Sequence, residues 1–137
     1  MKFIECEKVT NEEKAHIFQA LLNYNLSNLE EKIVKDIGIF VEDEKGTRVA
    51  GLIGETHGNW LEVEYLWVSE ELRGQHIGTK LMDKAEKIAR DRGCKYAFLN
   101  TFSFQAPDFY VKLGYKEEFV LTHYPLTGKR YYYTKKL

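Results

Sequence analysis

The sequence has few of the residues that hold together small secreted or metal-binding domains. Its two cysteines, Cys6 and Cys94, match neither a disulfide framework nor the paired spacing of a zinc site. It has only two prolines and no serine-rich, glycine-rich or low-complexity stretch, so nothing marks a linker between domains. A chain of 137 residues is long enough to bury one core without such cross-links. We therefore expect a single domain over residues 1–137.

The chain also lacks an excess of charge of either sign and any long apolar run. Twenty basic and 21 acidic side chains leave a net charge of −1, which excludes a basic nucleic-acid-binding surface spread over the domain. No apolar run approaches the roughly 20 residues of a membrane span, and residues 1–8 carry charges where a signal peptide would be apolar. These absences predict a cytoplasmic protein whose partners include neither nucleic acid nor membrane.

The hydrophobic pattern that is present predicts alternating strands and helices. Thr10 followed by Glu13 predicts a capping box that begins a helix running to about Leu26. A short strand is expected before it, over residues 2–6, and a second short helix after it, over residues 29–35. The later expected elements are strands over 37–43, 48–57 and 60–69, a helix over 77–92, a strand over 96–101, a helix over 106–113, and strands over 115–123 and 130–136. The order β-α-α-β-β-β-α-β-α-β-β predicts an α/β (α+β) fold with a mixed sheet and helices on its faces.

The most informative segment is residues 68–81, V-S-E-E-L-R-G-Q-H-I-G-T-K-L. A strand ends here and a glycine-bearing loop leads into a long helix, so backbone N–H groups and the positive end of the helix dipole converge. This arrangement is typical of a phosphate or pyrophosphate site. The segment is not a Walker loop, because Thr79 and Lys80 stand in the reverse of that motif's order, and it lacks G-x-G-x-x-G. The alternative is a glycine turn that only begins a surface helix.

Two motifs in the chain resemble those of one family. Residues 73–81, R-G-Q-H-I-G-T-K-L, resemble the acetyl-coenzyme-A-binding motif R/Q-x-x-G-x-G/A of the GNAT N-acetyltransferases. Residues 106–115, A-P-D-F-Y-V-K-L-G-Y, resemble that family's A-x-x-x-Y-x-k-x-G-F/Y segment, and the expected order of elements is also the family's. The resemblance implies one GNAT N-acetyltransferase domain with the GNAT fold and acetyl-CoA as cosubstrate, and no metal.

The resemblance also implies which residues bind the cosubstrate. The backbone amides of the loop Arg73–Thr79 are expected to hold the pyrophosphate, and Leu66–Val68 to bind the pantetheine arm and the acetyl carbonyl. The backbone N–H of Val68 would stabilise the oxyanion. Ser103 stands where many relatives carry an asparagine that contacts CoA. The expected cofactor-binding residues are Leu66, Trp67, Val68, Arg73, Gly74, Gln75, His76, Ile77, Gly78, Thr79 and Ser103.

His76 departs from the motif, because the family usually has its second glycine at this position. Glycine permits a positive φ, and histidine is among the non-glycine residues enriched in the left-handed conformation. We therefore expect the shape of the loop to be kept. The side chain of His76 either donates to a phosphate oxygen or faces solvent.

Acetyl transfer to an amine requires a base, because an alkylammonium group has a pKa of about 10. Glu62 and Glu64 alternate along the expected strand, on the same face as Leu66 and Val68, and partial burial would raise their pKa towards a useful value. Glu64 is the favoured base, while Glu62 has the position of the glutamate in histone-type members of the family. The alternative is that both carboxylates only solvate an exposed face of the sheet.

Tyr110 occupies the family's position for the acid that protonates the departing thiolate. A phenol with a pKa near 10 is protonated at pH 7 and can donate to sulfur. Neither cysteine lies in the motif region, so direct attack by the amine is expected rather than an acyl-enzyme. The expected function is N-acetyl transfer to a primary amine of a small molecule or peptide. The alternative is a catalytically weak CoA- or acyl-CoA-binding or sensing module.

Charge and aromatic residues suggest the acceptor and a second subunit. Glu55, Glu62 and Glu64 are expected to converge on the cleft, and no lysine or arginine occurs between Leu52 and Leu72. Such a locally negative cleft favours a cationic acceptor. In residues 130–136 three consecutive tyrosines predict a sheet edge that can pair with another subunit in a homodimer.

Overall fold

The structure, a computed structural model, describes residues 1–137 and has two compact units. The first unit covers residues 1–32. Its only regular element is helix α1 (Asn11–Asn28). Thr10 caps the helix as predicted, since its Oγ1 accepts a hydrogen bond from the backbone N–H of Glu13 at 3.1 Å. The predicted strand over residues 2–6 is wrong, because this unit contains no other strand to pair with its backbone groups.

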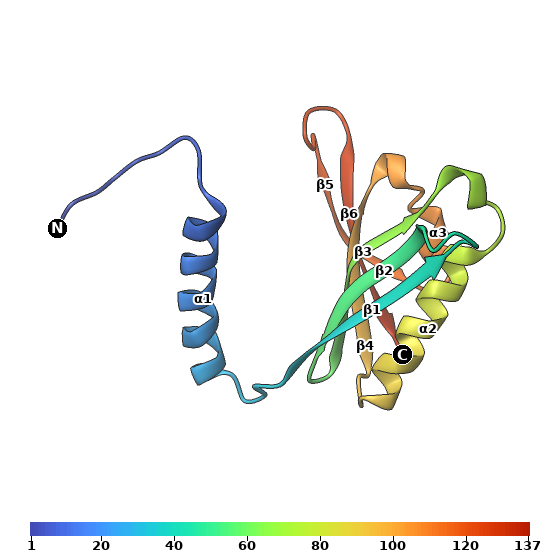
Figure 1. Ribbon diagram of the computed structural model, residues 1–137, viewed down its shortest axis with the longest axis horizontal. Coiled ribbons are helices and arrows are strands. Elements are labelled where there is room, and N and C mark those ends of the chain that lie inside the picture. Colours follow the sequence, from blue (N-terminus) through green and yellow to red (C-terminus); the bar gives the residue numbers. More distant parts are fainter. The chain divides into compact units, whose positions relative to one another are not determined.

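The second unit, residues 33–137, is built on a six-stranded mixed sheet in the order β1-β2-β3-β4-β6-β5 (Figure 1). Only β3 and β4 are parallel neighbours, and the other pairs are antiparallel. The elements are β1 (Val34–Glu42), β2 (Arg48–His57), β3 (Trp60–Val68), the 3₁₀ turn η1 (Glu70–Leu72), α2 (Ile77–Asp91), β4 (Tyr96–Phe102), the 3₁₀ turn η2 (Ser103–Gln105), α3 (Asp108–Lys112), β5 (Lys116–Thr122) and β6 (Lys129–Lys136). The mixed α/β fold is confirmed, as is the predicted order of elements from the first hairpin onwards.

Two predictions about the sheet are corrected. The second helix over residues 29–35 is absent, because Val34 and Lys35 already pair with His57 and Thr56 as the start of β1. The expected edge at Tyr131–Tyr133 is also absent. Strand β6 lies between β4 and β5 and pairs with both, so its backbone groups are already satisfied and the edges are β1 and β5.

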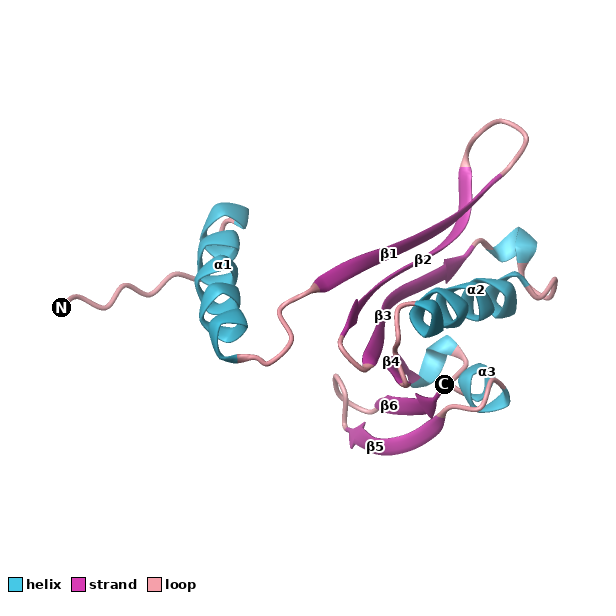
Figure 2. Cartoon of the chain, turned by 90° about the horizontal axis from the view of Figure 1, so that it is seen from below, coloured by secondary structure: helices cyan, strands magenta, loops and turns pink.

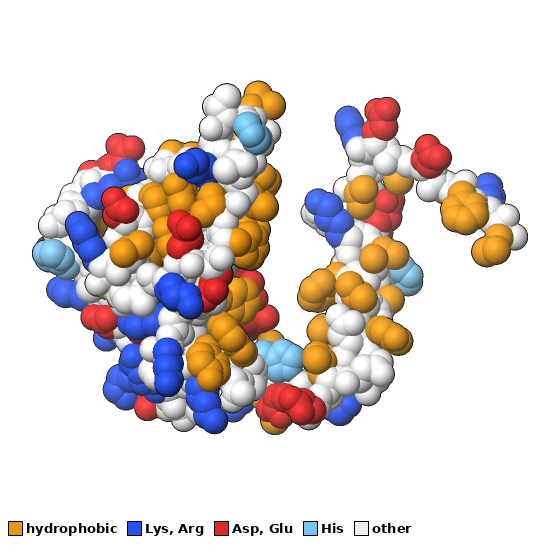
Figure 3. Space-filling model, turned by 180° about the vertical axis from the view of Figure 1, so that it is seen from behind, with side chains coloured by type: hydrophobic (Ala, Val, Ile, Leu, Met, Phe, Trp, Pro, Cys, Tyr) orange, Lys and Arg blue, Asp and Glu red, His pale blue; other side chains and the backbone are white.

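Helices α2 and α3 cover one face of the sheet (Figure 2). On α2 the residues Leu81, Ala85 and Ala89 recur every four positions and are buried in the core of this unit. No helix of residues 33–137 covers the other face, and hydrophobic side chains gather on it (Figure 3). We call this the open face. Because side chains alternate along a strand, the burial of Leu61 and Leu99 in the core places Glu62 and Phe98 on the open face.

A buried ionic cluster joins α2 to the end of the chain. The carboxylate of Glu86, only 2% exposed, accepts hydrogen bonds from the Tyr115 hydroxyl at 3.1 Å and from Lys135 Nζ at 2.7 Å. Arg90 on the same helix lies 3.5 Å from it. These partners compensate the charge of Glu86, which would otherwise be costly to bury.

Strands β3 and β4 pair over only three residues, Trp60–Glu62 with Tyr96–Phe98. Beyond these pairs β3 continues to Val68 and β4 to Phe102, each bonded only to its outer neighbour. The backbone groups of residues 63–68 and 99–102 that face each other are therefore available to a ligand. We call this divergence of the two strands the splay.

A β-bulge in β3 changes the direction of the side chains along it. Ile53 pairs with Tyr65 and the next residue, Gly54, pairs with Val63, so Glu64 is the extra residue. Val63 before the bulge is buried, and Leu66 and Val68 after it pack against the same core. The prediction that Glu62 and Glu64 share a face with Leu66 and Val68 is therefore wrong. At Gly54 a Cβ atom would overlap the backbone carbonyl of Glu62, so only glycine lets the strands approach this closely.

Candidate active site

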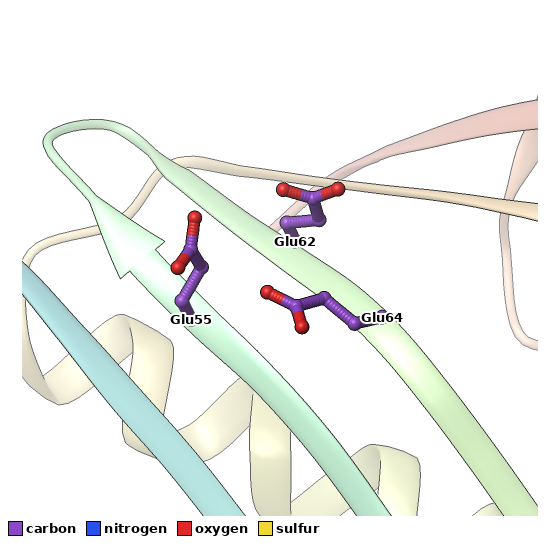
Figure 4. A group of neighbouring side chains, drawn as sticks. All are labelled: Glu55, Glu62 and Glu64. Carbon is purple, nitrogen blue, oxygen red and sulfur yellow. The ribbon is translucent and has the colours of Figure 1, made fainter. Parts of the chain in front are cut away.

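Three carboxylates meet where the splay begins. Glu55 of β2 and Glu62 and Glu64 of β3 point towards one another, with carboxylate oxygens within 4.8 Å, as predicted (Figure 4). Burial, followed by the negative charge of Glu55, raises the pKa of both Glu62 and Glu64 above its ordinary value. None of the ion pairs in the structure involves these three residues. The cluster is therefore a centre of uncompensated negative charge.

The carboxylates border a pocket of about 260 Å³ on the open face, which is lined by Glu55, His57, Trp60, Glu62 and Phe98. A larger and mostly aromatic groove of about 410 Å³ shares Trp60 and Phe98 with it and extends towards Phe119 and Tyr132. A cationic group can therefore lie near the carboxylates while an apolar body rests on the rings. Three carboxylates are also the ligand type of Mg²⁺ or Ca²⁺, which take six or more oxygen ligands.

The loop before α2 has the conformation of an anion site. His76, the N-cap residue, is left-handed at φ 60° and ψ 21°, which confirms the expected loop shape, and its side chain makes no capping hydrogen bond. Gly74 also has a positive φ, of 82°. The first hydrogen bond of the helix joins the Lys80 N–H to the His76 carbonyl at 3.1 Å, so the amides of residues 77–79 have no partner in the helix. They lie at the positive end of the helix dipole.

Two contacts hold this loop beside the end of β3. A Cβ atom on Gly78 would lie 3.2 Å from the ring of Phe109 and 3.9 Å from the side chain of Val68, so the absence of a side chain lets the helix start approach both. Arg73 Nε donates to the carbonyl of Val68 at 3.4 Å. The side chain of Gln75 turns back in the same way, to the Glu71 carbonyl at 3.5 Å. In this structure the loop therefore presents mainly backbone amides to a ligand.

Tyr110 of α3 is buried, and its ring packs against the rings of Phe109, Tyr115 and Tyr133. Burial raises the pKa of the phenol to about 12, and no hydrogen bond of the structure involves its hydroxyl. The phenol is therefore protonated at neutral pH. The ring of its chain neighbour Phe109 lies 3.2 Å from where a Cβ atom of Gly78 would be, so Tyr110 follows directly on a residue beside the loop.

The remaining predicted site residues lie in two places. Trp67 is 55% exposed, whereas Leu66 and Val68 pack against the core, and all three belong to the part of β3 that pairs with β2 but not with β4. Ser103 lies in η2, where its Oγ accepts a hydrogen bond from the backbone N–H of Lys129 at 3.4 Å. This bond ties η2 to the start of β6.

The aromatic lining of the pocket was missed from the sequence. No aromatic residue of β4 was expected in the site, but Phe98 lines both hollows on the open face. The alternation of β4 carried the signal, because Phe98 stands between Ala97 and Leu99, which are both buried in the core. No helix in the structure is both long and apolar enough to cross a membrane.

Comparison with known proteins agrees with this geometry. Residues 5–115 match the family described as Acetyltransferase (GNAT) family. The chain is 34% identical over 115 residues to an acetyltransferase of Agrobacterium fabrum, and the match covers 84% of both chains. It is 31% identical over 119 residues to the blasticidin-S acetyltransferase of Streptomyces morookaense, and that match covers 86% of both chains. The crystal structure of an acetyltransferase from Bacillus cereus superposes with a TM-score of 0.82 at 31% identity, covering 98% of both chains. The chain belongs to the GNAT family and is an acetyltransferase.

Proposed function

We propose that this chain transfers the acetyl group of acetyl-CoA to a primary amine of a small molecule or peptide. The observation that supports the proposal best is the placement of the splay. The edge of β3 that β4 leaves unpaired runs from the carboxylates at Glu62 to Val68, beside the loop of residues 73–79 before α2. Acetyl-CoA bound along this edge would have its pyrophosphate at the Val68 end of the strand. Its acetyl carbon would lie towards Glu62.

For acetyl-CoA, the proposed contacts are mostly backbone groups. The amides of residues 74–79 and the helix dipole hold the pyrophosphate, and the free edge of Leu66–Val68 holds the pantetheine arm. His76 keeps the left-handed turn that glycine usually provides. Ser103 is proposed as a further contact from η2.

In the proposed reaction the neutral amine nitrogen attacks the acetyl carbonyl carbon. A carboxylate of the cluster takes the proton of the amine, and a backbone N–H of residues 63–68 that β4 leaves unpaired donates to the oxyanion. The carbon–sulfur bond then breaks, and Tyr110 gives its proton to the thiolate. Glu62 lines the pocket and is half-buried, whereas Glu64 is exposed. The structure thus favours Glu62 as the base, although the sequence favoured Glu64.

The acceptor is proposed to carry positive charge at the carboxylates. Glu55, Glu62 and Glu64 have no basic partner, so they attract an ammonium group and lower its free energy in the pocket. A relative that is named for its action on blasticidin-S supports a small molecule as acceptor.

The loop assignment is tested by thermal unfolding with acetyl-CoA. At a hundred times Kd, binding should add about 2.7 kcal/mol to the free energy of unfolding. Gly78→Asp places a carboxylate in the anion site and should abolish this gain. Gly78→Ala is the matched control, because it brings the same Cβ against Phe109 without the charge and should keep most of the gain. An undiminished gain in Gly78→Asp would contradict the loop assignment.

Catalysis is tested separately, by the release of CoA thiol in the presence of spermidine, a lysine-rich peptide or glutamate. The proposal predicts turnover with at least one of these amines, at a rate that falls as added salt screens the carboxylates from the ammonium group. Stabilisation by acetyl-CoA without turnover of any amine would instead indicate a CoA-binding or sensing module.

A further inference from the structure

Arg130 of β6 is held on the open face by neutral groups. Its Nε donates to Asn100 Oδ1 at 2.9 Å and its Nη1 to the Tyr124 hydroxyl at 3.1 Å. The guanidinium carbon lies 5.3 to 5.5 Å from the ring centroids of Phe102, Tyr124 and Tyr132. Contacts from three segments of the chain therefore fix this one cation in place.

The charge of Arg130 has no carboxylate partner. None of the ion pairs in the structure includes it, and its Nη2 atom donates no hydrogen bond to a protein acceptor. A half-buried cation with only neutral partners is costly, and the planar fork of a guanidinium matches the two oxygens of a carboxylate or phosphonate. The free nitrogen and the missing counter-ion point to an anionic ligand.

The position of Arg130 relates it to the carboxylate cluster. In the register of the sheet, Glu62 pairs with Phe98, and Asn100 lies two residues further along β4 on the same face. Two strand residues and one strand spacing put the backbone positions of Glu62 and Asn100 roughly 8 Å apart. The negative cluster on β2 and β3 and the positive group bonded to Asn100 therefore border the start of the splay from opposite sides.

We propose that Arg130 binds an anionic group of the acceptor, so that the acceptor is a zwitterion. Its primary amine lies at the Glu55, Glu62 and Glu64 cluster, and its carboxylate, phosphonate or phosphate lies on the guanidinium of Arg130. This inference rests on the proposed function and narrows it, because a purely cationic acceptor leaves Arg130 without a partner. Arg130 thus determines which amines are accepted and takes no part in proton transfer.

The test uses matched acceptors that differ only in the anion. 4-Aminobutyrate is compared with 4-aminobutyramide, and 5-aminovalerate with 5-aminovaleramide. In the unchanged enzyme each acid should have the lower KM. Arg130→Met should raise the KM for the acids about 10- to 100-fold, the usual effect of losing a hydrogen bond to a charged group, and leave the KM for the amides within about twofold. Arg130→Lys keeps the charge without the fork and should restore part of the preference.

Arg48→Met is the matched control. Arg48 also lies over an aromatic ring, Phe40 at 3.9 Å, but it belongs to β2 and pairs with Glu42. This variant should leave both the acid and the amide unchanged. An equal loss for acids and amides in Arg130→Met would overturn the inference, because it would assign Arg130 only to holding the β5–β6 hairpin. A wild-type enzyme with no preference for the acids would overturn it as well.

Absence of turnover with every amine would instead contradict the proposed function. The inference is then decided by calorimetric titration of the same four compounds into the protein saturated with CoA. Tighter binding of the acids that Arg130→Met abolishes would support the anion site. Equal affinities for acid and amide would refute it.

Discussion

The substitution Tyr110→Phe separates the chemical role of the phenol from its packing. Tyr110 is only 9% exposed, and its pKa of about 12 follows from burial. At pH 8 a group with this pKa is ionised in only about one molecule in 10⁴, so the proton is available to a leaving thiolate. Removing the hydroxyl deletes the donor and keeps the ring.

Tyr110→Phe should lower activity strongly without lowering stability. Loss of one positioned acid should lower kcat by about 10² to 10⁴, which corresponds to about 3–5 kcal/mol in the barrier. The hydroxyl has no hydrogen-bond partner in the structure, whereas the ring contacts with Phe109, Tyr115 and Tyr133 remain. The free energy of unfolding should therefore stay the same or rise by about 1 kcal/mol.

Both quantities are measured on the same preparation, with kcat from thiol release and the free energy of unfolding from urea titration. Tyr115→Phe is the control. Its hydroxyl donates to the buried carboxylate of Glu86, so this variant should lose about 1–3 kcal/mol of stability while keeping its kcat. A near-normal kcat in Tyr110→Phe would refute the reasoning, because thiolate departure would then need no acid from this residue.

The pH dependence of stability gives a second check. Tyr110 has a folded-state pKa of about 12, compared with an ordinary value of 10.0 for a phenol, so the folded protein holds this proton more tightly than the unfolded chain. Its contribution is fully present below pH 10 and is lost as the pH rises towards 12, up to about 3 kcal/mol. Tyr110→Phe should remove this part of the alkaline loss. An unchanged alkaline profile would show that Tyr110 ionises normally in the folded protein.

Four further substitutions test other parts of the site and its frame. Because burial raises the carboxyl pKa of Glu62 and Glu64, kcat/KM should rise with pH to a plateau, with a midpoint above pH 4.5. Glu62→Gln or Glu64→Gln, whichever removes the base, should flatten this rise, and an unchanged rise in both variants would exclude both residues as the base. Gly54→Ala should destabilise the fold by more than 1 kcal/mol in urea titration, since the new Cβ overlaps the Glu62 carbonyl, and a neutral result would mean that the bulge adapts. Glu86→Ala should cost about 3–5 kcal/mol, because it leaves Lys135 largely buried without its anion, and a loss below 1 kcal/mol would show that Lys135 reaches water.

The parts of the fold that depend on local sequence could be predicted. The strand β2 and the start of α2 lie at the predicted residues, because alternation, helical spacing and a glycine-bearing loop are local signals. The left-handed conformation of His76 was expected for the same reason, since it depends on one residue and the turn around it.

The features that depend on distant pairings could not be predicted. Residues 60–68 alternate regularly in sequence, and the bulge at Glu64 arises only from the register with Gly54 on β2. The insertion of β6 beside β4 depends on how the last hairpin folds back, which no short pattern specifies. The surroundings of Arg130 join β4, the hairpin turn and β6, so they become visible only when the sheet is assembled.

The short pairing between β3 and β4 has a consequence for how the protein opens. Backbone hydrogen bonds divide the sheet into one half of β1, β2 and β3 and another of β4, β6 and β5, joined directly by three residue pairs. Local unfolding follows such cooperative units, so amide hydrogen exchange should protect the two halves to different extents. Side-chain contacts must then supply much of the coupling between them, including the bond from Glu86 on α2 to Lys135 on β6. A ligand that bonds to both edges of the splay would join the two halves of the sheet into one cooperative unit.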